Sequence, residues 1–146
     1  MADGRVRNVM ELYFVRHGKT AGNREGRYVG RTDEPLLPES LERLAGMRMP
    51  AVELVVASPM LRCRQTARAL YPGVPLRIEE ELREMDFGAF EYKNYEELNG
   101  KADYQRFLDS MGEAPFPGGE SKKEFSKRCS SAFEGELRKL MSEEAE

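Results

Sequence analysis

The sequence predicts an α/β fold with a doubly wound, mostly parallel sheet and helices on both faces. Residues 11–15 and 53–57 are short runs of β-favouring side chains, and each run stops at residues that favour a loop or the start of a helix. Apolar residues at helical spacing follow the second run, a weaker strand follows at 75–78, and the chain closes with a long helical stretch. Strands that alternate with helices in this way are typical of a parallel sheet covered by helices.

The length and composition indicate one globular domain, residues 1–146, with its own apolar core. The 23 basic side chains are balanced by 26 acidic ones, which argues against a general binder of nucleic acid. The arginines gather after His17 and around Arg62, and such local basic segments indicate a small anionic ligand. Two cysteines are too few for a disulfide framework, and no apolar stretch resembles a signal peptide or could span a bilayer. We therefore expect a soluble, cytoplasmic protein with no membrane partner.

The first predicted strand leads into the triplet Arg16-His17-Gly18, which contains the single histidine of the chain. Ligands bind at the carboxyl ends of the strands in open α/β sheets. Arginine matches phosphate oxygens in a bidentate fork, and a neutral imidazole can attack phosphorus, so the pair indicates phosphate chemistry. The plainer interpretation of three residues alone is a histidine beside an ordinary arginine.

Residues 18–38 show no sustained period, which predicts a long ordered loop over the site. Its polar and glycine features are Asn23, Arg24, Tyr28, Gly30, Arg31 and Asp33, which ordinary loop chemistry also explains. A short packing helix should begin at Pro38, with Leu41, Leu44 and Met47 on its apolar face.

The second predicted strand is followed by Ser58 and Pro59, which suit an N-cap and the first position of a helix. The N-terminus of a helix attracts anions, so Arg62 in the first turn could contact the same anion as the arginine of the triplet. Arg64 and Arg68 lie elsewhere on the helix surface and are more often solvated charges than ligands.

The second half of the chain supplies a candidate proton donor. Carboxylates are dense in residues 79–91, and one of them could serve as a proton donor if it were partly buried beside Phe87 and Phe90, which would raise its pKa. A solvated acidic loop is the simpler interpretation. Residues 94–109 look like one helix, and 115–121 look like a turn before the last helix. The apolar face of that last helix would consist of Phe125, Cys129, Ala132, Phe133, Leu137 and Leu140.

Five segments of the sequence indicate a protein family more specifically together than any one of them does alone. They are Val15-Arg16-His17-Gly18-Lys19-Thr20-Ala21-Gly22-Asn23, Gly30-Arg31-Thr32-Asp33, Ser58-Pro59-Met60-Leu61-Arg62-Cys63-Arg64-Gln65-Thr66-Ala67, Leu82-Arg83-Glu84-Met85-Asp86-Phe87-Gly88-Ala89-Phe90-Glu91 and Pro117-Gly118-Gly119-Glu120-Ser121. In this order they resemble the histidine phosphatase superfamily, the phosphoglycerate mutase-like enzymes, over nearly the whole chain. The Gly-Arg-Thr-Asp stretch looks most like the α-ribazole phosphatase branch.

The resemblance implies a role for several residues. His17 matches the nucleophile that becomes phosphohistidine, and Arg16 and Arg62 match the two guanidiniums that hold the phosphoryl oxygens. Asn23 matches a phosphate-contacting side chain, and Glu84 matches the acid that protonates the leaving alkoxide and then activates water. In the same way we expect Gly30 and Arg31 to contribute to substrate binding. Fixed arginines can supply the charge stabilisation that Mg²⁺ gives kinases, so we expect no metal and no cofactor.

The sequence departs from the family pattern at two places. The family has a second active-site histidine at the end of a later strand, whereas this chain has no other histidine. We therefore expect a chain truncated before that strand, with an unpaired sheet edge that favours self-association. The second departure is Tyr92, where the family usually has glycine.

The sequence thus predicts a metal-independent phosphomonoester hydrolase that acts on a small phosphorylated metabolite through phosphohistidine. Two alternatives stay open. One is a phosphoglycerate mutase, which would return the phosphoryl group to a second hydroxyl. The other is a catalytically inactive phosphate-binding module, which the absent second histidine motivates. The four residues Arg16, His17, Arg62 and Glu84 should line one concave pocket.

Overall fold

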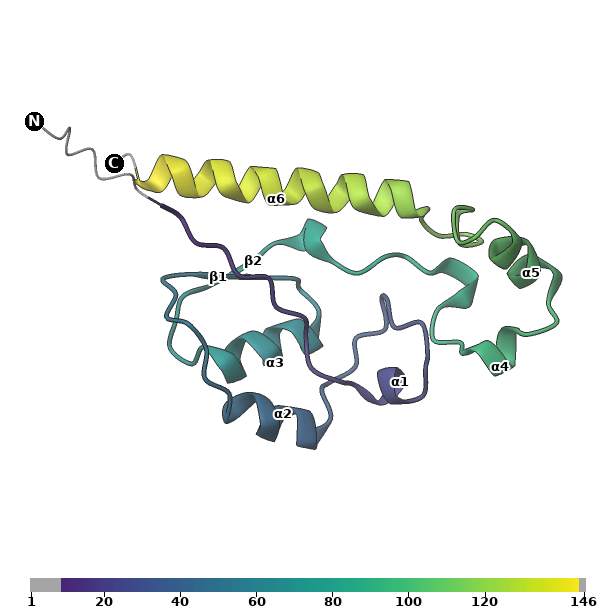
Figure 1. Ribbon diagram of the computed structural model, residues 1–146, viewed down its shortest axis with the longest axis horizontal. Coiled ribbons are helices and arrows are strands. Elements are labelled where there is room, and N and C mark those ends of the chain that lie inside the picture. Colours follow the sequence, from purple (N-terminus) through teal and green to yellow (C-terminus); the bar gives the residue numbers. More distant parts are fainter. Residues whose placement is uncertain (1–8, 145–146) are drawn as a thin grey trace, which may run out of the picture.

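The computed structural model of the chain describes residues 9–144. Figure 1 shows its elements, which follow in chain order: α1 (Ala21–Arg24), α2 (Pro38–Ala45), β1 (Val55–Ala57), α3 (Leu61–Leu70), β2 (Leu76–Ile78), η1 (Glu80–Leu82), η2 (Gly88–Phe90), α4 (Tyr95–Leu98), α5 (Ala102–Asp109) and α6 (Lys122–Glu144). In this view α2 and α3 lie on one side of the two strands and α6 runs along the other side.

The two strands form a parallel pair. Val55 pairs with Leu76 and Ala57 with Ile78, and α3 makes the crossover that a parallel connection requires. The strands predicted at 53–57 and 75–78 are therefore confirmed, each somewhat shorter than the pattern that predicts it.

The strand predicted at 11–15 is wrong as a strand. Residues 9–19 have no regular secondary structure, and Thr20 makes an isolated antiparallel bridge with Leu36. The side chains of the segment are exposed, with Phe14 at 81% and Leu12 at 46%. A strand exists only where a neighbouring chain offers a ladder of hydrogen bonds, and within residues 9–144 none pairs with this segment. Residues 11–15 have a composition that favours a strand, but they have no paired strand within residues 9–144.

The start of α3 also differs from the prediction. The helix begins at Leu61 with Met60 as its N-cap, so Ser58 and Pro59 lie before it. The Leu61 N–H donates to Oδ1 of Asp33 at 2.7 Å, which means that a carboxylate from the long loop satisfies one of the free donors of this helix end. A cap supplied from so far along the chain leaves no local signal in the sequence.

Residues 94–109 form two short helices rather than the predicted single one. Asn94 caps α4 by accepting the Glu97 N–H at 3.0 Å. Gly100 then adopts φ 86°, a left-handed conformation that ends one helix before α5 begins. Leu98 and Tyr104 are buried, whereas Tyr95 is 59% exposed.

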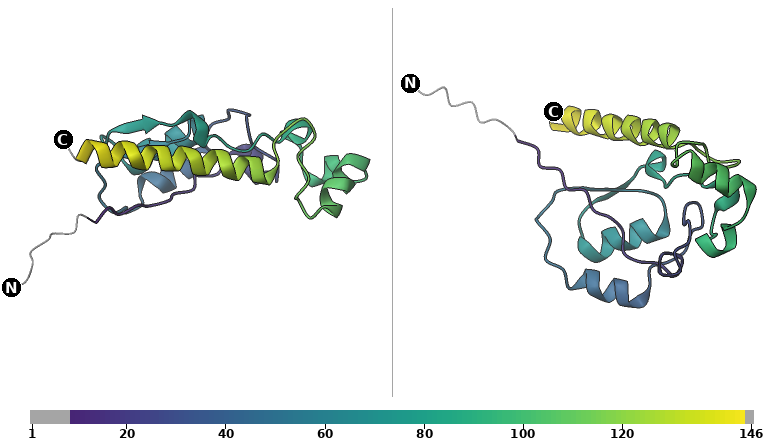
Figure 2. Two further views of the ribbon diagram at one scale, coloured as in Figure 1. Left: turned by 90° about the horizontal axis from the view of Figure 1, so that it is seen from above. Right: turned by 45° about the vertical axis from the view of Figure 1, so that its right-hand side comes forward.

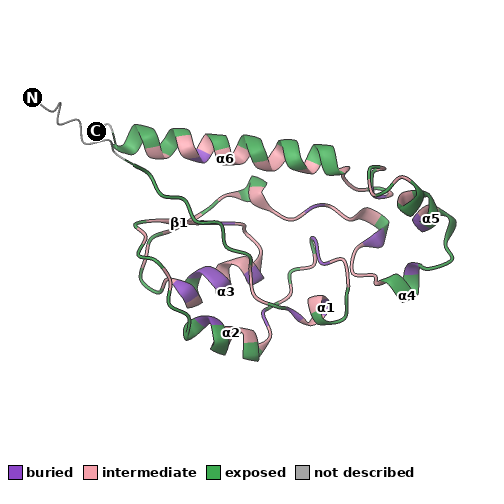
Figure 3. Ribbon diagram, viewed as in Figure 1, coloured by how far each residue is buried: buried purple, intermediate pink, exposed green. Residues whose placement is uncertain are grey.

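The long helix α6 lies on the outside of the molecule, and Figure 2 shows it from two further directions. Its only buried residue is Glu136, and the six apolar positions predicted for it are half-buried, whereas Met141 is 65% exposed (Figure 3). Arg77 of β2 fixes the helix through ion pairs with Glu136 at 3.0 Å and Glu143 at 2.7 Å. Among the helices of residues 9–144, none is both long and apolar enough to cross a membrane.

Among the described residues, two small apolar clusters form the core. One consists of Met85, Phe90, Leu98, Tyr104 and Phe116, and its aromatic rings pack mostly edge to face. The other joins Leu36, Leu44 and Leu70, which lie in the long loop, α2 and α3. Glu84 directly precedes the first cluster and Arg62 lies on α3 beside the second, so the candidate site is built from both halves of the core.

Candidate active site

The segment that carries His17 is anchored on α3 through a threonine. The backbone N–H of Gly18 donates to Oγ1 of Thr66 at 3.1 Å, and that hydroxyl donates to the Arg62 carbonyl oxygen at 2.8 Å. Thr66 is 5% exposed. The chain immediately after His17 is therefore held one helical turn from Arg62, although 45 positions separate the two residues in the sequence.

The imidazole of His17 has a defined tautomer. Its Nδ1 lies 2.6 Å from the Gly18 carbonyl oxygen, which can only accept, so Nδ1 carries the proton and Nε2 keeps its lone pair. Burial lowers the pKa of His17 below its ordinary value, and the charges of Arg62 and Arg16 lower it further, while the Gly18 hydrogen bond and the Glu84 charge act in the opposite direction. The result is a neutral imidazole with one free nitrogen, within electrostatic reach of both arginines and the glutamate.

The guanidinium of Arg62 is almost fully buried, at 1% exposure. Nη1 donates to the Thr32 carbonyl oxygen at 3.0 Å, and Nη2 donates to those of Gly30 at 2.9 Å and Val29 at 3.2 Å. Its Nε–H has no partner among the described residues. A buried cation with an unused donor is suited to an incoming anion, because a buried donor without a hydrogen bond costs free energy.

The loop around Gly30 is held from two directions. Arg62 binds its carbonyl oxygens, and the carboxylate of Glu91 accepts from its donors: the N–H groups of Gly30 at 3.0 Å, Arg31 at 3.1 Å and Thr32 at 3.2 Å, and the Thr32 hydroxyl at 2.8 Å. A Cβ at Gly30 would lie 2.6 Å from the Met85 carbonyl oxygen, so only glycine fits there. Both backbone groups of Gly30 are thus engaged inside the protein.

The other two loop candidates are also engaged within the fold. Arg31 is exposed and its Nη2 pairs with Oδ2 of Asp86 at 2.9 Å. Asn23 forms a capping box with Thr20, in which Oδ1 accepts the Thr20 N–H at 3.0 Å. The Nδ2 donors of Asn23 are not used in this box. Ligand binding by Asn23, Gly30 and Arg31 stays a prediction.

Arg16 and Glu84 are the less buried members of the arrangement. Arg16 is exposed, and Glu84 is half-buried with Oε1 accepting the Met85 N–H at 2.8 Å. Both charges act on the imidazole of His17. The charges of the other three predicted catalytic residues, Arg16, Arg62 and Glu84, therefore all act on His17, and the catalytic roles of the four stay predictions.

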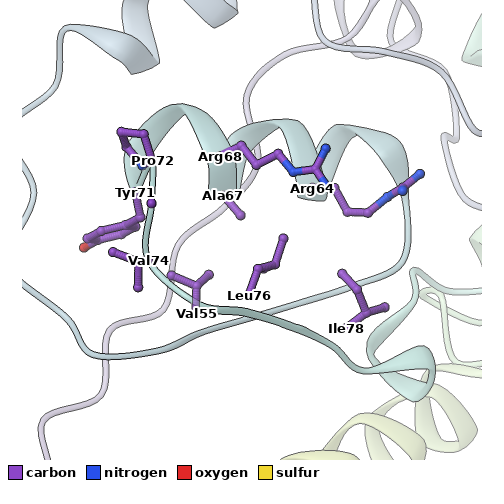
Figure 4. Close-up of a pocket in the computed structure, with 10 residues that line it drawn as sticks. Val55, Arg64, Ala67, Arg68, Tyr71, Pro72, Val74, Leu76 and Ile78 are labelled. Atoms are coloured by element: carbon purple, nitrogen blue, oxygen red, sulfur yellow. The ribbon is translucent and has the colours of Figure 1, made fainter.

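An open cavity of about 530 Å³ lies between α3 and the two strands (Figure 4). Arg64 and Arg68, which the sequence treats as solvated charges, line it together with Val55, Leu76 and Ile78. A second cavity of about 340 Å³ lies beside α5. Neither contains a predicted site residue, so the concave pocket expected around His17 is not one of these two.

Tyr92, where the resembled family usually has glycine, has φ 59°. This left-handed conformation explains the usual glycine, because other residues adopt it at a cost. The tyrosine gains contacts in exchange: its hydroxyl donates to Oε2 of Glu34 at 2.8 Å, and the guanidinium of Arg27 lies 5.2 Å above its ring. Glu34 also accepts the Gly22 N–H at 2.9 Å.

Sequence reasoning misses the residues that hold the site together, namely Thr66, Glu91 and Asp33. All three lie within the segments quoted for the family resemblance, and each contacts backbone at least 28 positions away. The one signal that could have pointed to these residues is that each is a polar side chain within such a segment. Within residues 9–144, no group of three or more His, Cys, Asp or Glu side chains could hold a metal ion.

Comparison with known proteins places this geometry in a family. The sequence model of the histidine phosphatase superfamily (branch 1) matches residues 12–145. The chain belongs to the histidine phosphatase superfamily. As a member of this superfamily it has the α/β phosphoglycerate mutase-like fold with a parallel sheet and helices, as predicted.

Individual relatives carry two kinds of name. A probable phosphoglycerate mutase GpmB of Escherichia coli O1:K1 / APEC is 29% identical over 134 residues, which cover 86% of this chain and 62% of that relative. The crystal structure of a putative alpha-ribazole-5'-P phosphatase from Escherichia coli K-12 has a TM-score of 0.77 at 28% identity, covering 86% of this chain and 66% of that one. The phosphoglycerate mutase of Thermus thermophilus gives 0.67 at 35% identity, covering 82% and 68%. This histidine phosphatase chain therefore spans about 62% of the length of the curated relative.

Proposed function

We propose that the protein is a metal-independent phosphomonoester hydrolase that acts through a phosphohistidine intermediate on a small phosphorylated metabolite. The observation that carries the proposal is the state of His17: Nδ1 donates to the Gly18 carbonyl oxygen, and the lowered pKa keeps the ring neutral. Nε2 therefore has the lone pair that nucleophilic attack requires. The superfamily membership supports the same chemistry.

In the first step, Nε2 of His17 attacks phosphorus and the bond from phosphorus to the ester oxygen breaks. Negative charge spreads over the phosphoryl oxygens, where Arg16 and the unused Nε–H of Arg62 stabilise it. Glu84, in its protonated form, gives its proton to the departing alkoxide. The products of this step are the free alcohol and phosphohistidine.

In the second step, the Glu84 carboxylate takes a proton from water, and the resulting hydroxide equivalent attacks the phosphohistidine. The bond between phosphorus and Nε2 breaks, inorganic phosphate leaves, and His17 is neutral again. Glu84 regains its proton and the cycle closes. One carboxyl group acts as acid in the first step and as base in the second.

The first substrate to test is a nucleoside-like phosphomonoester such as α-ribazole 5'-phosphate. The Gly-Arg-Thr-Asp stretch and the similarity to the structure named as an alpha-ribazole-5'-P phosphatase favour it. The relatives named phosphoglycerate mutase favour a second candidate, in which the phosphoryl group returns to another hydroxyl of the glycerate.

The deciding experiment compares release of inorganic phosphate with formation of the isomeric phosphoglycerate in the full-length protein. We expect phosphate release, retained after EDTA, together with an acid-labile phosphoenzyme that His17→Ala abolishes. Arg68→Gln is the matched control, because Arg68 is an exposed arginine of the same helix α3 and lines a cavity away from His17. Isomer formation would favour the mutase, and phosphate binding without either product would favour an inactive binding module. Strict dependence on added Mg²⁺ would contradict the arginine-based mechanism.

A further inference from the structure

Arg128 on α6 uses all five of its guanidinium donors, and each of them bonds to Glu120 or to a backbone carbonyl oxygen. Nε and Nη2 donate to the two carboxylate oxygens of Glu120, each at 2.9 Å. Nη1 donates to the backbone carbonyl oxygens of Glu81 at 2.7 Å and Arg83 at 2.9 Å, and Nη2 also donates to that of Glu84 at 3.3 Å. Three of the five bonds therefore hold the backbone that leads to the proposed acid.

Glu120 holds the same backbone from the other flank. Its Oε2 accepts the Asp86 N–H at 3.2 Å, and its own N–H donates to the Asp86 carbonyl oxygen at 2.9 Å. The pair thus fixes the chain on both sides of Glu84. The Glu84 carboxylate accepts the N–H of Met85, so its direction depends on this stretch of backbone.

The pair is largely buried and stays charged. The side chains of Arg128 and Glu120 are 12% and 17% exposed. The hydrogen bonds from Arg128 hold the pKa of Glu120 below its ordinary value. A bidentate arginine pair has a planar geometry that lysine cannot reproduce. The turn at 117–121, which the proposed chemistry leaves without a role, is what brings Glu120 to this position.

We propose that Arg128 and Glu120 are positioning residues for the proton-transfer step, because together they hold the backbone on both sides of Glu84. This inference rests on the proposed function, in which Glu84 is the acid and the base. A displacement of about 1 Å in a catalytic group can cost about a hundredfold in rate. The loss should appear where protonation of the leaving group limits the rate and should be absent where it does not.

The test uses Arg128→Lys in the full-length protein with two substrates. An alkyl phosphate such as glycerol phosphate needs its leaving group protonated, whereas 4-nitrophenyl phosphate does not. We measure kcat/KM, which reports the steps up to formation of the phosphohistidine and is independent of its later hydrolysis. We expect kcat/KM to fall about ten- to a hundredfold for the alkyl phosphate and less than about threefold for the aryl phosphate. Glu120→Gln keeps one acceptor oxygen, so it should give a smaller loss of the same pattern and serves as the measurement if Arg128→Lys does not fold.

The matched control is Arg77→Lys. Arg77 also ties α6 to the rest of the protein through two glutamates, Glu136 and Glu143, and so should affect stability without selective loss on the alkyl phosphate. Glu84→Gln separates the two proposals. If Glu84→Gln loses activity selectively on the alkyl phosphate and neither Arg128→Lys nor Glu120→Gln does, the positioning role is overturned and the assignment of Glu84 as the acid stands. No selective loss in Glu84→Gln overturns the assigned acid and, with it, the positioning role.

Discussion

The left-handed conformation of Tyr92 permits a quantitative test of what its side chain contributes. Met111 provides the reference, because it has almost the same φ, 57° against 59°, while its side chain is 86% exposed. Replacement by glycine removes about 1 kcal/mol of backbone strain, and about half of this is offset by the greater freedom of glycine in the unfolded chain. Met111→Gly should therefore raise the free energy of unfolding by about 0.5 kcal/mol.

Tyr92→Gly relieves the same backbone strain as Met111→Gly, but it also removes the contacts of the tyrosine side chain. The hydrogen bond from its hydroxyl to Glu34 contributes about 1.5 kcal/mol, and the half-buried ring contributes about 1 kcal/mol. The net change should be a loss of about 2 kcal/mol, and Tyr92→Phe should lose about 1.5 kcal/mol because it removes the hydroxyl alone.

Urea unfolding followed by far-ultraviolet circular dichroism measures these changes, since the chain contains no tryptophan. The informative quantity is the difference between the two glycine variants, about 2.5 kcal/mol, because the backbone contribution cancels in it. If Tyr92→Gly were as stable as Met111→Gly, the contacts to Glu34 and Arg27 would contribute nothing, and the explanation given for a tyrosine at this position would be wrong.

Further predictions concern the charged groups of the site. Because burial lowers the pKa of His17, the acidic limb of a kcat/KM profile should have its midpoint below pH 6.5, and a midpoint above that value would contradict a neutral, desolvated nucleophile. The lowered pKa also means that the unfolded chain binds a proton more readily than the folded one, so stability should fall as pH decreases through 6.5, and His17→Asn should remove this part of the decrease in urea titrations. Glu91→Ala leaves three backbone N–H groups without an acceptor and should cost about 3 kcal/mol, measured against the exposed Glu96→Ala at under about 0.5 kcal/mol; equal stabilities would refute the proposed role in holding the loop.

Local composition predicts the elements whose structure depends on local interactions. Residues 53–57 and the helix at Pro38 follow directly from runs and spacing, and the structure contains both. The segment at 11–15 fails because a strand depends on a neighbour, and nothing in its own composition shows whether that neighbour exists. The start of α3 fails for a related reason, since its donor is satisfied by Asp33 from 28 positions earlier.

In the candidate site, too, some residues can be found from the local sequence and others depend on contacts with distant parts of the chain. His17, Arg62 and Glu84 could be found because they stand in recognisable segments, and the structure gathers their charges. Their supports lie in the same segments, but the sequence does not show which backbone groups they contact. Glu91 looks like any acidic residue in an acidic stretch, and its four hydrogen bonds become visible only when residues 30–32 are brought beside it.

The loop around Gly30 takes its shape from Arg62 and Glu91, which bind its carbonyl and amide groups respectively. Every peptide has those groups whatever its side chain. The side chain of Arg31 is 60% exposed and plays no part in these contacts, because its ion pair is with Asp86. Residue 31 can therefore change in evolution while the buried arginine and its hydrogen bonds to the loop stay in place.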